Sequence, residues 1–191
     1  MSLVDTAIYY DSEPVNLPDD RVERGDHLVT MVFRNGWVSP NFMMGKHWSR
    51  ARKFRKELDE QAKMHFLALP PEEREQVKIR DPKLRVAIIN IVQRRGPFPD
   101  VDNLLGGLKH LIDSLKLRRG TKQIVEKDNG SQSKKLTYDE TGNPWIWDDS
   151  PRHFQVAEVH VSRQSAYVNT EPGNYVVVDL YEDVDSRPAK S

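Results

Sequence analysis

The chain has 191 residues, with 29 Lys and Arg balanced by 29 Asp and Glu, so its formal net charge at neutral pH is zero. This length suits one domain with its own core. The lack of cysteine excludes disulfides and thiolate zinc sites. Any nucleic-acid binding must come from the distribution of charge and not from its total. No apolar run is long enough to cross a bilayer and the N-terminus is acidic, unlike a signal peptide, so we expect no membrane partner and a cytoplasmic location.

The N-terminal residues 1–27 are acidic and contain two prolines, which predicts a poorly ordered arm. Residues 28–33 are typical of a short strand. Asn35 and Gly36 then form a turn signal, and residues 37–38 would begin the return strand of a hairpin. The sequence therefore predicts that the folded domain begins near residue 28.

A helix is predicted over residues 49–67, because apolar side chains recur there at helical spacing. The stretch around its start is rich in cations, which either form a solvated basic face or contact DNA phosphates. The candidates for phosphate contact here are Lys46, Arg50, Arg52 and Lys53. Two prolines at positions 70 and 71 end the helix, and residues 72–77 are expected to form a further short turn.

Residues 84–92 are apolar at both alternating sets of positions, which is typical of a central strand covered on both faces. Arg94 and Arg95 follow this strand directly. Guanidinium groups bind phosphate well, so both arginines are candidates for holding DNA near the acidic stretch that comes next.

The most informative stretch follows, where a proline-rich segment turns into a helix ending at Leu115. Asp100 and Asp102 stand one residue apart at this junction, and we expect Asp102 to be the helix N-cap. The leucines of this helix form one stripe, and Asp102, Lys109 and Asp113 fall on the opposite side.

Paired carboxylates at a loop-to-helix junction suit a hard divalent cation such as Mg²⁺, which takes oxygen ligands. A third acid from elsewhere would complete such a site, and Asp148 and Asp149 are the nearest acidic pair along the chain. A bound cation could activate water and neutralise charge on a phosphodiester. The alternative is structural: one aspartate caps the helix and its neighbour sits in a turn.

Residues 117–145 separate the helix from this acidic pair, and their start is basic. We expect a flexible tip at residues 128–133, a hairpin edge near residues 136–138, and a ribbon that faces DNA. The candidate phosphate contacts here are Lys116, Arg118, Arg119 and Lys122.

Two more strands, at residues 154–161 and 175–181, complete the expected fold, and the tail at residues 183–191 is expected to fray. The prediction is one α/β (α+β) domain over residues 28–182. It has a mixed sheet of about four strands packed with two main helices.

Three motifs give this chain a resemblance to a known family. They are Asp100-Val101-Asp102-Asn103-Leu104, the Lys109 to Asp113-Ser114-Leu115 spacing, and Trp147-Asp148-Asp149 ahead of a strand. Together they resemble the RusA family of Holliday junction resolvases. Its members are homodimeric, Mg²⁺-dependent endonucleases that cut four-way DNA junctions, and many are encoded by phages and prophages.

The resemblance implies a RusA-like fold and assigns roles to individual residues. Asp100, Asp102 and Asp149 would be the catalytic, metal-binding carboxylates, with Asp148 as the adjacent metal-site acid and Lys109 as the catalytic lysine. Two departures stand out. The family lysine follows the second aspartate by four residues, a position held here by Gly106, and the family has a short turn in place of residues 117–145.

The sequence is thus expected to encode an enzyme, a Mg²⁺-dependent endonuclease that resolves Holliday junctions, with Mn²⁺ as a substitute metal. Its partners would be branched DNA and a second copy of the chain, in a bacterial host cell if the protein is phage-encoded. The alternatives are a flap or fork endonuclease, a junction-binding protein that does not cleave, and an α/β domain whose aspartates only cap and turn.

Overall fold

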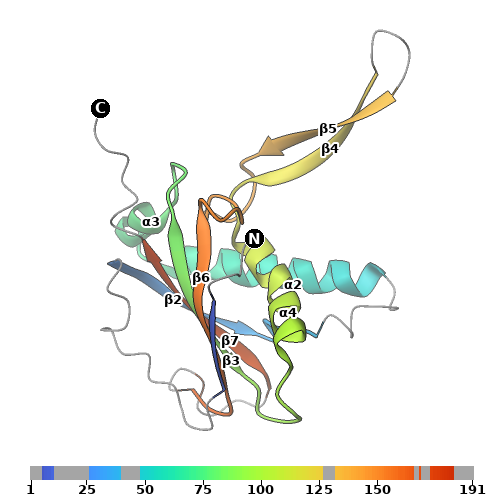
Figure 1. Cartoon of the computed structure of the whole chain (residues 1–191). Helices are drawn as coiled ribbons and strands as arrows, with labels where there is room; N and C mark the ends of the chain where they lie inside the picture. Colours follow the sequence, from blue (N-terminus) through green and yellow to red (C-terminus); the bar gives the residue numbers. More distant parts are fainter. Residues whose placement is uncertain are drawn as a thin grey trace.

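The computed structural model describes residues 6–10, 26–39, 48–126, 132–165, 168 and 173–182, with backbone alone for residues 48, 121–126 and 132–136. Within them lie three helices, a five-stranded sheet and a separate two-stranded ribbon (Figure 1). In chain order the elements are β1 (Ala7–Tyr10), β2 (Asp26–Arg34), α2 (Trp48–Ala68), α3 (Pro71–Val77), β3 (Arg85–Val92), α4 (Val101–Leu115), β4 (Arg119–Glu126), β5 (Gln132–Asp139), β6 (Phe154–Ser162) and β7 (Tyr175–Glu182).

The five-stranded sheet is mixed and has the order β1-β6-β3-β7-β2. Strand β3 is central: it runs parallel to β6 and antiparallel to β7, and all eight of its residues are buried. Parallel strands need a long crossover connection, and here that connection contains α4 and the ribbon. Helix α4 and the segment that follows it therefore both belong to the connection that leaves the sheet at the end of β3.

Helices α2 and α4 lie together on one face of the sheet (Figure 1). Most of the apolar stripe of α4 is buried, including Leu104, Leu108 and Leu111, and from α2 Leu58 and Ala62 join the same core. Burying each of these leucines stabilises the fold by about 1.5–3 kcal/mol. The polar side of α4 is thereby fixed toward solvent, which positions the site described below.

Two tryptophans tie the loops to these helices. The Trp145 side chain is buried and its Nε1 donates to the backbone oxygen of Ala62 at 2.9 Å. Trp37 Nε1 donates to the backbone oxygen of Leu104 at 3.0 Å, and Gly107 leaves room for the indole ring. Trp37 therefore packs on α4, and the hairpin return strand expected at residues 37–38 is wrong.

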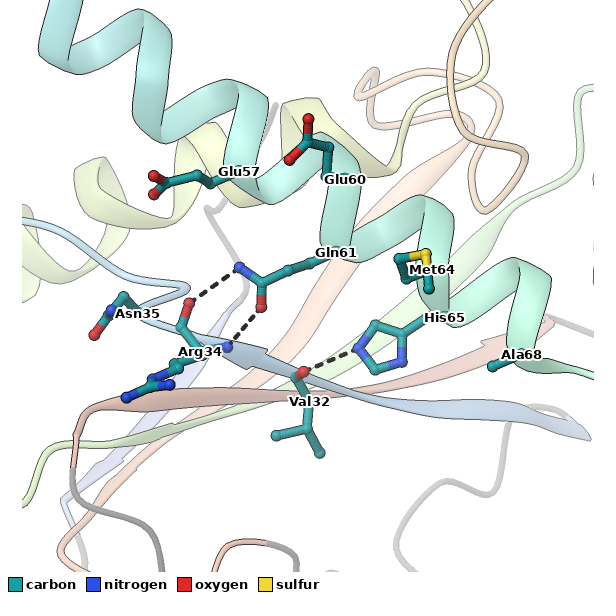
Figure 2. A pocket seen from close by; sticks show the side chains of 9 residues that line it. All are labelled: Val32, Arg34, Asn35, Glu57, Glu60, Gln61, Met64, His65 and Ala68. Carbon is teal, nitrogen blue, oxygen red and sulfur yellow. Dashed lines mark hydrogen bonds between the residues drawn. The ribbon is translucent and has the colours of Figure 1, made fainter.

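The outer edge of β2 is covered by side chains of α2 (Figure 2). Gln61 Oε1 accepts from the backbone nitrogen of Arg34 at 2.8 Å, and Gln61 Nε2 donates to the backbone oxygen of the same residue at 3.2 Å. His65 Nε2 lies 2.9 Å from the backbone oxygen of Val32. Helix α2 thus contacts three of the outward-facing backbone groups at the C-terminal end of this edge strand.

The single α+β domain with a mixed sheet and the positions of its two main helices are confirmed, but the sheet has five strands where four were expected. The additional strand, β1, comes from the stretch expected to be a poorly ordered arm, and it pairs in parallel with β6. Residues 1–5, 11–25 and 183–191, the rest of that arm and the tail, lie outside the described residues.

The stretch expected as an insertion forms the β4–β5 ribbon, which extends away from the sheet (Figure 1). Its strands pair in register from Arg119 opposite Asp139 to Glu126 opposite Gln132, and the expected flexible tip falls largely on residues that are not described. Among the described helices, none combines the length and the apolar character needed to cross a bilayer.

Candidate acid–lysine site on helix α4

The first aspartate of the Asp-x-Asp pair is the N-cap of α4. Asp100 has an extended backbone, and its Oδ1 accepts from the backbone nitrogen of Asn103 at 2.8 Å. Its Oδ2 accepts from Asn103 Nδ2 at 2.9 Å. The expectation that Asp102 is the cap is therefore wrong by two residues, because the carboxylate of Asp100 reaches the third helical N–H and satisfies it.

The second aspartate lies in the first turn of α4 and is exposed. Its negative charge is favourable there because the helix dipole places partial positive charge at this end. Tyr10 of β1 lies beside the junction, since its Oη donates to the backbone oxygen of Pro99 at 2.9 Å. Burial, and then the charge of Asp100, raise the pKa of Tyr10, which places the Asp100 carboxyl group close to the phenol.

A short backbone pairing brings Asp148 and Asp149 to the other end of the helix. Lys116 forms a parallel bridge with Ile146, and the backbone nitrogen of Arg118 donates to the backbone oxygen of Trp147 at 3.0 Å. The residues that follow Trp147 are therefore held against the last turns of α4.

Four charged side chains meet at this place, and we call them the acid–lysine cluster: Lys109, Asp113, Lys116 and Asp149. Lys116 Nζ lies 2.7 Å from Asp113 Oδ1 and 3.1 Å from Asp149 Oδ1. Lys109 Nζ lies 3.7 Å from Asp149 Oδ2 and 3.9 Å from Asp113 Oδ1. Lys109 and Asp113 are four residues apart on one face of α4, and Lys116, the C-cap of the helix, follows Asp113 by three residues.

Charge pairing dominates the titration of this cluster. Burial by itself would raise the pKa of Asp149, but the ammonium of Lys116, with a smaller contribution from Lys109, holds it below its usual range. Burial would lower the pKa of Lys116, but Asp113 and Asp149 outweigh it and raise that pKa. Both groups are therefore charged at neutral pH.

Asp148 is held in a different set of contacts from its neighbour. Its Oδ1 accepts from the backbone nitrogen of Ser150 at 2.9 Å and lies 2.8 Å from His153 Nδ1. Burial would raise the pKa of Asp148, but these hydrogen bonds lower it overall. Asp148 therefore orders the turn into β6, and no contact in the structure joins it to the acid–lysine cluster.

The donor chemistry of these acids fits Mg²⁺, because carboxylates supply the hard oxygen atoms that this ion takes as ligands. Their arrangement is different from the expected three-acid set. Asp102 and Lys109 are separated by about 10 Å along the helix axis at 1.5 Å per residue. Within the part of the chain that is described, no three side chains of Asp, Glu or His lie close enough together to hold a metal ion.

Sequence reasoning missed two members of this cluster. Asp113 was placed on the polar face of the helix without a role, and Lys116 was assigned to DNA phosphates. Both follow Lys109 at spacings that bring helical side chains together, so the helical pattern could have linked them to one another. Helical spacing gave no indication that Asp149 would join them, and only the resemblance to the RusA family placed it with Lys109.

The predicted DNA-binding residues fall into two groups. Several already have partners inside the protein: Arg119 makes a bidentate ion pair with Asp59, and Arg94 donates to the backbone oxygen of Val168. Lys116 belongs to the acid–lysine cluster, and Arg118 lies against two aromatic rings. The exposed candidates are Arg50, Arg52, Lys53 and Arg95. Lys46 and the side chain of Lys122 lie outside the described part of the structure.

Two hollows flank α2. A polar one of about 270 Å³ adjoins the acid–lysine cluster, and its lining includes Arg55, His110, Asp113, Lys116 and Arg119. Arg55 Nε donates to His110 Nδ1 at 3.0 Å, and burial followed by the charge of Arg55 lowers the pKa of His110. A larger pocket of about 760 Å³ lies between α2 and β2 (Figure 2). The polar hollow has the charged groups that could bind an anion.

Comparison of the chain with protein-family models, with curated proteins and with solved structures found no match of any of these three kinds.

Proposed function

We propose that this protein is a metal-dependent endonuclease that cuts branched DNA, with the Holliday junction as its main substrate. The observation that supports it is the contact between Lys109 and Asp149, whose charged atoms lie 3.7 Å apart. These two residues are distant in the sequence, and the RusA resemblance assigns both to one catalytic site. A basic ribbon and an exposed basic start of α2 supply charge for the phosphate backbone.

In this proposal Mg²⁺ or Mn²⁺ would be held by the carboxylates that the resemblance assigns to it, Asp100, Asp102 and Asp149 with Asp148, although the described part of the structure does not bring these four into one metal site. The metal would activate a water molecule and neutralise charge that develops on the scissile phosphate. Lys109 offsets part of that charge, and Lys116 keeps Asp149 ionised. Symmetric cutting of a four-way junction needs two active sites, so the proposal includes a two-fold dimer.

A specific observation also favours a second candidate, a protein that binds branched DNA without cutting it. Asp149 is already paired with two lysines, and Asp100 with Asn103. The negative charge of Asp149 is thus balanced within the protein, and both carboxylate oxygens of Asp100 are occupied by hydrogen bonds. A third candidate, a flap or fork endonuclease, would use the same acids, with the ribbon selecting a different branch.

One experiment separates these candidates. Purified protein is incubated with a synthetic four-way junction, a flap and a linear duplex, with and without Mg²⁺, beside the variant Asp102→Asn. The matched control is Asp81→Asn, which removes an exposed carboxylate from the loop between α3 and β3. We expect paired nicks on the junction that require the metal, vanish in Asp102→Asn and persist in Asp81→Asn.

Other results would redirect the proposal. Cutting mainly of the flap would keep the active site and change the substrate. Tight junction binding with no cleavage in Mg²⁺ or Mn²⁺ would establish the non-cleaving protein. Absence of both binding and cleavage would refute a role on branched DNA.

A further inference from the structure

An exposed tyrosine stacks on an arginine where the ribbon joins the body of the protein. The guanidinium carbon of Arg118 lies 4.7 Å from the ring centroid of Tyr138 and 5.7 Å from that of Trp147. The Tyr138 side chain remains 56 % exposed. We call these three residues the ribbon-base stack. A large aromatic ring left this exposed, with its position fixed by a cation, is suited to stacking against a ligand.

The ribbon-base stack is anchored next to the acid–lysine cluster. Arg118 is two residues from Lys116, and Trp147 is two residues from Asp149. The backbone hydrogen bond of 3.0 Å from Arg118 to Trp147 joins the two chain segments that carry the ribbon-base stack and the acid–lysine cluster. A ligand bound on the stack therefore lies beside the residues proposed to act on a phosphodiester.

Register and charge indicate which ligand fits. Gly120 stands directly opposite Tyr138, so no side chain covers the tyrosine from the neighbouring strand. Lys122 and Lys134 occupy register positions on the same face of the ribbon. Residues 116–139 contain seven Lys and Arg against three Asp and Glu. Exposed aromatic rings within a basic ribbon are the combination that binds unpaired nucleotides, with the rings under the bases and the cations near the phosphates.

We propose that the ribbon-base stack holds an unstacked base at the branch point of DNA, with the base lying on the ring of Tyr138. This inference rests on the proposed function, since it takes branched DNA as the partner. It adds a recognition step: the protein distinguishes a branch from a duplex because a base at a branch point leaves its stack at a lower free-energy cost than a base within a duplex.

The test uses the full chain in metal-free buffer at one fixed salt concentration, so that binding is measured without cleavage. The probes are a four-way junction with 2-aminopurine beside the crossing point and a duplex of the same sequence. The variants are Tyr138→Leu and Tyr138→Phe. The matched control is Tyr9→Leu, because Tyr9 is a 44 % exposed tyrosine on strand β1.

We expect 2-aminopurine fluorescence to be quenched when wild-type protein binds the junction. Tyr138→Leu should lose the quenching and weaken junction binding by about 10-fold, within the range that removing one base-stacking aromatic produces. Duplex affinity should not change. Tyr138→Phe keeps the ring and should retain both the quenching and the affinity, and Tyr9→Leu should behave like wild type.

Three results would overturn the inference. The first is wild-type junction affinity and quenching in Tyr138→Leu. The second is an equal loss in Tyr138→Phe, which would assign the effect to the hydroxyl. The third is an equal loss on the duplex, which would indicate a phosphate contact or a misfolded ribbon. None of these three results would contradict the proposed endonuclease function, provided that Asp102→Asn still abolishes cleavage. Failure of the wild-type protein to bind any branched DNA would refute both proposals.

Discussion

At the scale of single residues, Lys116 holds the acid–lysine cluster together. Its side chain is 19 % exposed and contacts two carboxylates, whereas the Lys109 side chain is 58 % exposed and makes longer contacts. Lys116→Met keeps the aliphatic stem and leaves Asp113 and Asp149 without their closest cation. We expect it to lower the free energy of unfolding by about 1–3 kcal/mol, as for a partly buried charged hydrogen bond.

The measurement is urea denaturation, with Lys109→Met as the control. Because exposed ion pairs contribute little, the control should cost about 0–1 kcal/mol. Equal effects of the two variants would show that Lys116 has no special structural role.

The cluster also predicts how stability depends on pH. The pKa of Asp149 is lower in the folded protein than in the unfolded chain, where it is about 3.9. Its contribution is therefore present above about pH 4 and is lost as pH falls through the lower folded value. For Lys116 the pKa is raised, so its contribution is complete below about pH 10.4 and is lost as pH rises through the higher folded value.

We expect the stability difference between wild type and Asp149→Asn to be constant near neutral pH and to shrink below about pH 4. Urea denaturation across the acid range measures it, with the exposed Asp81→Asn as control. A difference that stays constant down to the acid limit would contradict the pairing of Asp149 with Lys116.

The sequence predicted the separate parts of the candidate site better than their arrangement. The position of Asp100 and Asp102 at the helix start could be predicted, because a proline-rich segment followed by a stripe of leucines is a local sequence pattern. The placement of Asp149 depends on the pairing of Lys116 with Ile146 across the whole ribbon. No local pattern encodes that long-range pairing. The spacing of residues in the sequence therefore could not predict that Asp149 would lie near the C-terminal end of α4.

At the scale of elements, two adjacent glycines in α4 have different reasons to be there. A methyl group on Gly107 would collide with the indole of Trp37 and lie 2.7 Å from the backbone oxygen of Val38. Gly106 is exposed. Gly107→Ala should therefore destabilise the protein by about 1–3 kcal/mol through overpacking. Gly106→Ala should stabilise it by up to about 1 kcal/mol, because alanine favours the helix.

Thermal unfolding of the two variants tests this prediction directly. Gly107→Ala should lower the melting temperature, and Gly106→Ala should raise it. A destabilised Gly106→Ala would contradict the exposed position of that glycine.

Elements with a strong local signal were predicted well, and those decided by tertiary contacts were not. The apolar stripe of α4 and the apolar residues on both faces of β3 favour burial in any tertiary arrangement. Local sequence was therefore enough to predict these two elements. Strand β1 has four residues, and it forms because β6 offers a free parallel edge. Trp37 follows a turn signal, but packing on α4 removes it from the sheet.

At the scale of the whole molecule, the ribbon is an addition to a complete domain. It forms its own two-stranded sheet and extends away from the core (Figure 1). Replacing residues 121–137 with Asn-Gly keeps Arg119 and its ion pair to Asp59. We expect calorimetry to give a melting temperature within about 4 °C of wild type, which corresponds to a change of at most about 1–2 kcal/mol in the free energy of unfolding. We also expect the variant to bind the junction more weakly than wild type. Loss of cooperative unfolding would show that the domain needs the ribbon.

Gln61 has a consequence for how two copies of this chain could associate. A free strand edge is a template on which another chain can add a strand, and such addition leads either to a continuous sheet through a dimer or to aggregation. At the Val32–Arg34 end of β2 that template is occupied, because the side-chain amide of Gln61 takes both backbone groups of Arg34 and His65 Nε2 contacts the backbone oxygen of Val32. A second copy could add a strand along this end of β2 only by displacing α2, which also carries part of the core. This end of the β2 edge is therefore protected against unregulated growth of the sheet.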